Sequence, residues 1–124
     1  MKRTIALVAF AGSCALAKAA GGTHWQFEHL YSFNPATDGA TPLAGLVEAG
    51  GVFWGTTSAG GPGRGARGNV FKFVPGTSPV VMHTFRGGDG ATPQGELLAV
   101  GRNLYGTVEN GMLNNYGGIY RMST

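Results

Sequence analysis

Cysteine, charge and helical periodicity are all scarce in this chain of 124 residues. Its one cysteine, Cys14, excludes an internal disulfide, so the fold must depend on its own packing. After the N-terminal segment, no stretch places apolar residues at helical spacing over three turns, which excludes a helical domain. No serine stands in a GxSxG context, and the glycine-rich stretch 60–68 lacks the GK[ST] ending of a phosphate-binding loop. The common nucleophile and nucleotide motifs are therefore missing.

The N-terminal segment has the pattern of a secretory signal peptide. Two basic residues precede an apolar run over residues 4–17, which is too short to span a bilayer. An A-x-A cleavage site ends at Ala19, so we expect residues 1–19 to be removed and the mature protein to be secreted, periplasmic or displayed at the cell surface. A lipoprotein signal with Cys14 as the lipidated residue is the alternative.

Removing this signal would leave a neutral protein. The whole chain has nine Lys and Arg against six Asp and Glu, a net charge of +3. Residues 1–19 contain three of the basic residues, so six of each sign remain in the mature part. A neutral chain offers no electrostatic reason to bind nucleic acid, and we expect no such partner.

The rest of the chain contains an internal sequence repeat. The word DGATP at residues 38–42 returns 51 positions later, at residues 89–93. Three further words return in the same order: LYSF at 30–33 as MHTF at 82–85, FWGTT at 53–57 as LYGTV at 104–108, and GNVFKF at 68–73 as GGIYRM at 117–122. The offset changes only in Gly- or Pro-rich stretches, as expected if these are loops. A period near fifty residues indicates a repeat architecture.

The matched words are aromatic or β-branched and are separated by turn residues, which indicates an all-β protein. Tight hairpin turns are expected at Gly50-Gly51 and Gly101-Arg102. Four strands in about fifty residues is the spacing of a kelch-like propeller blade, so we predict two four-stranded antiparallel propeller-like blades, over residues 20–78 and 79–124. The expected strands cover residues 25–33, 43–48, 52–57 and 69–74, then 80–85, 95–100, 103–108 and 118–122.

Together the words LYSF, DGATP, AGLVEAGGVFWGTTSAGG and GNVFKF resemble the GloVer-type tandem repeat of bacterial choice-of-anchor proteins, and the resemblance covers nearly everything from His29 onward. It implies an exported or surface-displayed, propeller-like β-repeat protein without an established activity or catalytic residue set. Family members often carry many repeats and a C-terminal sorting tail, whereas this chain has two repeats and ends at Thr124.

Two blades cannot close a ring, and each open end would expose an apolar blade face. Copies of the chain could assemble into a ring, for example a trimer of six blades, or the chain could be a shortened version of a longer repeat protein. Head-to-tail contacts make rings where they close and filaments where they do not.

Asp38 and Asp89 are the acidic residues that occur in both units. Calcium ligands or a catalytic carboxylate pair are one interpretation, but no DxDxDG-like run surrounds either residue. An Asp before Gly is a common turn former whose carboxylate accepts backbone N–H bonds, and we favour this structural role. We expect no catalytic set, no metal site and no cofactor.

Two aromatic and two basic residues complete the candidate binding set. Trp54 and Tyr105 occupy matching positions and could stack on sugar rings, although packing between blades is the favoured role. Arg64 and Arg67, in the long loop 58–68, could bind an acidic ligand, although a solvated loop is favoured. His24, His29 and His83 do not recur as histidines at matching positions, and we assign them no role.

These patterns predict an exported, non-enzymatic β-repeat protein that binds a polysaccharide or a cell-envelope component, or serves as a structural module, with homo-oligomers closing a propeller. The alternatives are a polysaccharide-active enzyme that uses Asp38, Asp89 or Glu96 as acid and base, and a truncated repeat remnant without a ligand.

Overall fold

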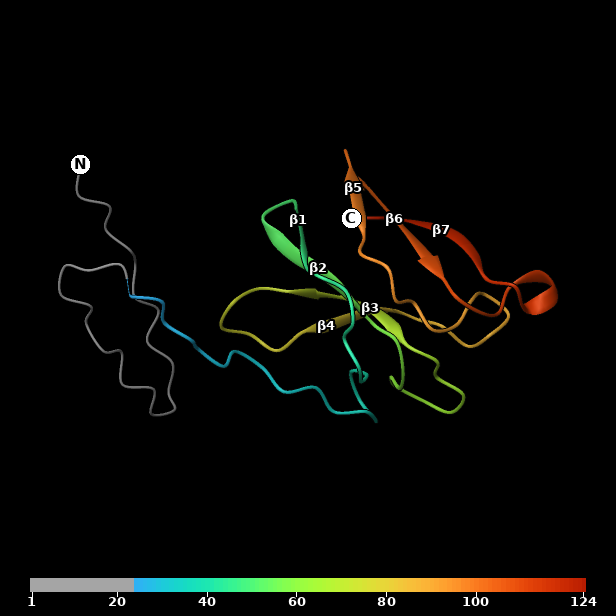
Figure 1. The fold of residues 1–124 in the computed structure, drawn as a ribbon, viewed down its shortest axis with the longest axis horizontal. Coiled ribbons are helices and arrows are strands. Elements are labelled where there is room, and N and C mark those ends of the chain that lie inside the picture. Colours follow the sequence, from blue (N-terminus) through green and yellow to red (C-terminus); the bar gives the residue numbers. More distant parts are fainter. Residues whose placement is uncertain (1–23) are drawn as a thin grey trace.

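A computed structural model describes residues 24–124; the predicted signal peptide, residues 1–19, lies outside the described residues. The described chain forms two antiparallel sheets, which confirms the all-β prediction (Figure 1). The first sheet has the order β1 (Val47–Ala49), β2 (Val52–Thr57), β3 (Asn69–Phe73) and β4 (Val80–Thr84). The second has the order β5 (Leu98–Val100), β6 (Asn103–Val108) and β7 (Gly118–Ser123), with a short 3-10 turn, η1 (Leu113–Asn115), before β7.

The prediction of four strands in each blade was wrong for the second sheet, which has three. The expected strand over residues 25–33 is absent from the structure. Strand β4, which opens the second repeat in the sequence, pairs instead with β3 and completes the first sheet. The physical reason is that a strand forms only where another strand offers its free hydrogen-bonding edge. β3 offers such an edge to β4, whereas no strand within residues 24–124 pairs with residues 25–33.

Strands β1 and β5 are also shorter than the expected segments 43–48 and 95–100. Each pairs over three residues, up to Val47 opposite Trp54 and Leu98 opposite Tyr105. The hairpin turns lie where they were predicted: Gly50 and Gly51 both have positive φ, at 64° and 79°, between the paired residues Ala49 and Val52. Glycine adopts this backbone conformation without steric cost, so the Gly-Gly pair suits the turn.

The core lies between the two sheets. One face of the first sheet contributes Ala49, Trp54 and Val70, and the second sheet contributes Leu104 and Val108. Residues 24–124 form an open pair of sheets and do not close a ring (Figure 1). The structure thus confirms an all-β fold of two antiparallel sheets, and the propeller arrangement stays a prediction. Among the described residues, no helix is long and apolar enough to cross a lipid bilayer.

Each sheet contains one glycine that an aromatic ring from the next strand covers. Gly55 lies opposite Phe71, and Gly106 lies opposite Tyr120. A methyl group at either glycine would overlap the opposing ring. The glycine in FWGTT and LYGTV is therefore required by side-chain packing, because the ring occupies the space that a Cβ atom would fill.

Candidate functional site

The DGATP word forms a tight corner in both repeats, and the first corner is centred on Asp38. The carbonyl of Asn34 accepts hydrogen bonds from the backbone N–H groups of Thr37, Asp38 and Gly39, at 3.1, 3.0 and 3.1 Å. In return, the N–H of Asn34 donates to Asp38 Oδ1 at 2.5 Å. The hydroxyl of Tyr31 donates to the other carboxylate oxygen, Oδ2. Asp38 is buried, with 7% of its surface exposed, so these bonds replace the water that the carboxylate loses.

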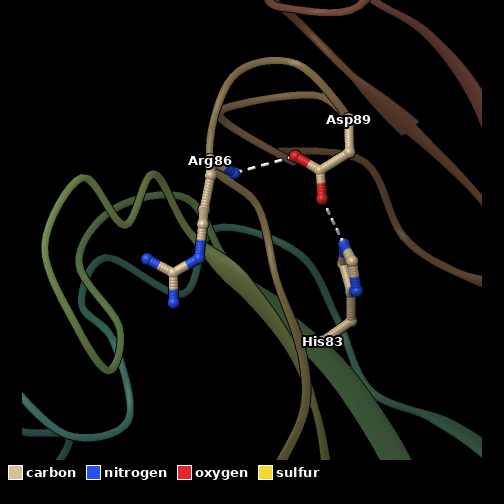
Figure 2. A network of polar contacts seen from close by, with 3 residues as sticks. All are labelled: His83, Arg86 and Asp89. Carbon is tan, nitrogen blue, oxygen red and sulfur yellow. Dashed lines mark hydrogen bonds and ion pairs between the residues drawn. The ribbon is translucent and has the colours of Figure 1, made fainter.

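The second corner repeats this arrangement around Asp89 (Figure 2). The N–H of Arg86 donates to Asp89 Oδ1 at 2.8 Å, and Nε2 of His83 donates to Oδ2, also at 2.8 Å. Figure 2 shows the carboxylate held between these two residues, while the Arg86 guanidinium points away from it. Asp89 is exposed, in contrast to Asp38. Each aspartate thus accepts one bond from a backbone N–H and one from a side chain, which is the predicted turn role.

Tyr31 and His83 are the members of this site that the sequence analysis missed. They occupy the same position in the two repeats, 52 residues apart, and both reach the same oxygen, Oδ2, of their aspartate. His83 does not recur as histidine, so the identities shared by the two repeats do not point to it. What recurs is a ring that carries a hydrogen-bond donor, and the match between LYSF and MHTF was the signal that could have revealed it.

The corners shift the pKa of two of their groups. Partial burial alone would raise the pKa of Asp89, but hydrogen bonds from the N–H groups of Arg86 and of Asp89 itself, and from His83, hold it below the ordinary 3.8. In the first corner, the hydrogen bond to Asp38 raises the pKa of Tyr31, and burial and the negative charge of Asp38 act in the same direction. Both shifts favour the protonation states that make the observed hydrogen bonds.

Neither corner has the form of a metal site. Across residues 24–124, no group of three or more His, Cys, Asp or Glu side chains is placed to hold a metal ion. Both oxygens of Asp38 and both oxygens of Asp89 already accept hydrogen bonds from the protein. The arrangement suits the anchoring of a chain reversal better than proton transfer to a substrate.

The threonine of DGATP adopts a left-handed backbone conformation in both repeats. Thr41 has a φ of 58° and Thr92 a φ of 56°, which is strained for a β-branched residue. The carbonyl of each accepts a hydrogen bond from the backbone N–H of the residue that follows FWGTT or LYGTV. The donors are Ser58 for Thr41, at 3.1 Å, and Glu109 for Thr92, at 3.2 Å. The corner is therefore fixed on two sides, by the aspartate and by this hydrogen bond.

The predicted aromatic pair differs in exposure. Trp54 lies in the core with 3% of its surface exposed, and its indole N–H donates to the carbonyl of Ala49 at 3.1 Å. Its ring therefore has almost no surface on which a sugar could stack in this structure. Tyr105, at the matching position of the second sheet, is half-buried. The two positions are equivalent, but within residues 24–124 another sheet covers only the first.

Arg64 and Arg67 are both exposed, and their loop is fastened by a residue that the sequence analysis did not select. The guanidinium of Arg86 donates to the carbonyls of Arg64 and Pro62, at 2.7 and 3.2 Å. The backbone of Arg67 donates to Phe85 at 2.8 Å and accepts from Thr92 at 2.9 Å. The backbone of Arg67 thus joins the end of the first sheet to the second corner.

A cleft of about 670 Å³ lies between the two sheets, beside the second corner. Strand β4 and the corner contribute His83 and Asp89, and strand β7 contributes Tyr120, Arg121 and Met122. Burial raises the pKa of Tyr120 to about 12, and its hydroxyl has no hydrogen-bond partner within residues 24–124. An apolar floor with a few polar groups is typical of a binding cleft. Of the predicted site residues, the cleft includes Asp89 alone.

Comparison with known proteins agrees with the repeat seen in the sequence and in the structure. No match was found among curated proteins or among solved structures. A family model, described as the Gloeobacter/Verrucomicrobia repeat, matches residues 15–124, which include both corners and all seven strands. The chain therefore belongs to the Gloeobacter/Verrucomicrobia repeat family.

Proposed function

We propose that this chain is an exported, non-enzymatic β-repeat module that assembles head to tail with copies of itself and binds a polysaccharide or another cell-envelope component in the assembled form. One observation carries the proposal: the outer faces of the two sheets expose apolar side chains whose repeat equivalents are buried between the sheets.

Two pairs of equivalent residues illustrate this difference. Val70, on the inner face of the first sheet, is 0% exposed, whereas its equivalent in the second sheet, Ile119, is 77% exposed. On the opposite side of the same interface, Leu97 is 4% exposed, whereas its equivalent in the first repeat, Leu46, is 49% exposed. Each outer face thus exposes an apolar residue whose repeat equivalent is buried at the inner interface.

The two outer faces are therefore complementary to each other. The outer face of the second sheet also exposes Leu98 and Val100, equivalents of the inner residues Val47 and Ala49. If it covered the Leu46 side of a second copy, it would repeat the interface already present inside the chain. Exposed apolar patches of this kind are typical of protein interfaces, and burial of apolar area would drive association. Such a contact is heterologous and continues from copy to copy.

The proposed ligand follows from the cleft. Its polar groups include His83, Asp89 and Arg121, and Tyr120 lies in its floor. A hydroxyl-rich ligand such as a polysaccharide would find hydrogen-bond donors, acceptors and an aromatic ring there. Export is supported by the signal-peptide pattern of the sequence. A polysaccharide-active enzyme receives less support, because the carboxylates of Asp38 and Asp89 already accept two hydrogen bonds each from the protein.

Two matched substitutions test the assembly. Ile119→Lys places a charge on the outer face of the second sheet, and Leu113→Lys places one in η1, which has no equivalent at the inner interface. Both side chains are exposed, so both variants should fold. We expect Ile119→Lys to lower the solution mass measured by light scattering and Leu113→Lys to leave it unchanged. An equal effect of both, or no effect of Ile119→Lys, would contradict the proposed face.

A further inference from the structure

The free edge of β7 and the extended residues 28–33 are equivalent to a pair of strands that meet inside the chain. Strand β3 corresponds to β7 through the words GNVFKF and GGIYRM. Strand β4 and Phe85 correspond to residues 28–33 through MHTF and LYSF. In the first sheet, β3 and β4 pair as antiparallel neighbours. In the second sheet, β7 pairs with β6 on one side, and no strand of the described chain lies on the other.

Residues 28–33 already lie against the first sheet as β4 lies against the second. Phe33 contacts Phe71 with ring centroids 5.1 Å apart and planes at 60°, and Phe85 contacts Tyr120 at 5.0 Å and 64°. Within the segment, Tyr31 and Phe33 meet edge to face at 5.5 Å and 84°, as His83 and Phe85 do at 4.8 Å and 78°. The segment is thus placed like the last strand of a preceding sheet.

A cavity next to this segment supports the same conclusion. It measures about 450 Å³ and lies between residues 27–33 and the outer face of the first sheet, where Phe71 and Phe73 line it. The cleft between the two sheets is lined by the equivalents of both phenylalanines, Tyr120 and Met122. The contact between sheets is therefore present a second time, with residues 27–33 in the place of the last strand of a preceding sheet.

We propose that residues 28–33 of one copy add to the free edge of β7 of another copy as its fourth strand. This inference rests on the proposed head-to-tail assembly and identifies the segment that forms the contact between two copies. The added strand would complete a four-stranded sheet like the first one and would satisfy the backbone groups of an open edge. It would also bring the Leu46 face of one copy onto the Ile119 face of the other.

The register follows from the pairing of β3 with β4. There Asn69 lies opposite Thr84, Val70 opposite His83 and Lys72 opposite Val80. The equivalent pairs across the two copies are Gly118 with Ser32, Ile119 with Tyr31, and Arg121 with Glu28. Arg121 and Glu28 are both exposed in the single chain and carry opposite charges. Opposite charges directly across a strand pair favour that register.

Cysteine cross-linking between two differently labelled chains tests this register. Each chain carries Cys14→Ser, so that the introduced thiol is the only one. Directly opposed residues of antiparallel strands have Cα atoms about 4.5–5.5 Å apart, within the range that a disulfide spans. We expect a mixture of Glu28→Cys and Arg121→Cys chains to form a disulfide-linked heterodimer under mild oxidation, identified by mass spectrometry of the linked peptides.

Ile119→Cys is the matched control for Arg121→Cys. It lies on the same face of β7, two residues away, so a disulfide to Glu28→Cys would have to span more than about 7 Å. The Glu28–Arg121 pair should therefore cross-link several times more than the Glu28–Ile119 pair. Circular dichroism of each variant shows whether it is folded, and light scattering of the unmodified chain shows whether it assembles.

The outcomes separate this inference from the proposed function. An assembled, folded protein that cross-links both pairs equally, or neither, would overturn the strand addition and leave head-to-tail assembly standing. A protein that stays monomeric would overturn both. A charge exchange adds a second check: Glu28→Lys or Arg121→Glu alone should weaken association by up to about fivefold, and the double variant should restore it. Failure of the double variant to restore association would overturn the register.

Discussion

Phe85, at the end of the first sheet, packs on Tyr120 of the second with ring centroids 5.0 Å apart. Phe33 and Phe71, at the equivalent positions one repeat earlier, make the same contact at 5.1 Å. The repeat therefore encodes a way of stacking one sheet on the next as well as a sheet. Residues 24–124 contain one stack of two sheets, and Phe33 packs on the outer side of the first sheet as Phe85 packs on the second.

The buried corner should be worth more to the fold than the exposed one. Asp38→Asn keeps an oxygen for the N–H of Asn34 but replaces the acceptor of the Tyr31 hydroxyl by an amide. We expect it to lower the free energy of unfolding by about 1–3 kcal/mol, because a partly buried charge-assisted hydrogen bond is lost. Asp89→Asn, in the exposed corner, is the matched comparison and should cost less. Denaturant unfolding of both variants measures the difference.

The same two variants distinguish a turn role from catalysis. If Asp38→Asn and Asp89→Asn abolished hydrolysis of a polysaccharide while leaving the stability of the wild type intact, the enzyme alternative would be favoured. The corner geometry predicts a different result: Asp38→Asn lowers stability more than Asp89→Asn does, and the wild type does not hydrolyse the polysaccharide.

The pH dependence of stability should contain a contribution from Asp89. The hydrogen bonds that it accepts hold its pKa in the folded protein below the ordinary 3.8. Their stabilisation is therefore fully present above about 3.8 and is lost as the pH falls through the lower folded value. Asp89→Asn has no such titration, so its unfolding free energy should change less between pH 5 and pH 2. Parallel pH curves for wild type and variant would contradict this assignment.

The two ring-covered glycines allow a test of sheet packing. Gly106→Ala would place a methyl group in the space of the Tyr120 ring, and we expect a loss of about 1–3 kcal/mol from forced displacement. Gly88→Ala is the matched control, because a Cβ atom there meets no atom of residues 24–124 within 4 Å. It should change stability by less than about 0.5 kcal/mol. Thermal unfolding of both variants measures the two changes in stability. If Gly106→Ala were as stable as the wild type, the Tyr120 ring would have to move aside.

Much of this fold could be predicted because its signals are local. Glycines with positive φ form the Gly50-Gly51 turn, and an aspartate before glycine forms each corner. The matched words also show which strands are equivalent. Packing of Trp54 against the facing sheet follows from its place on a buried strand.

The features that could not be predicted from the sequence depend on which strand edge lies beside which segment of the chain. A repeated sequence does not say at which strand a sheet begins, so the repeat places β4 in the second blade although it completes the first sheet. Its equivalent, residues 28–33, lies in a predicted strand but pairs with no strand of the part of the chain that the structure describes. The role shared by Tyr31 and His83 was hidden because two different rings donate the same hydrogen bond.

The solution mass of the chain, measured by light scattering on a size-exclusion column, tests the central claim most directly. Head-to-tail assembly predicts a mass that is a multiple of the single chain, as a discrete ring or as a filament series, because the exposed Ile119 and Leu46 faces cover each other. A stable, folded monomer whose mass does not change with concentration would contradict the claim, since both apolar faces would then remain in water.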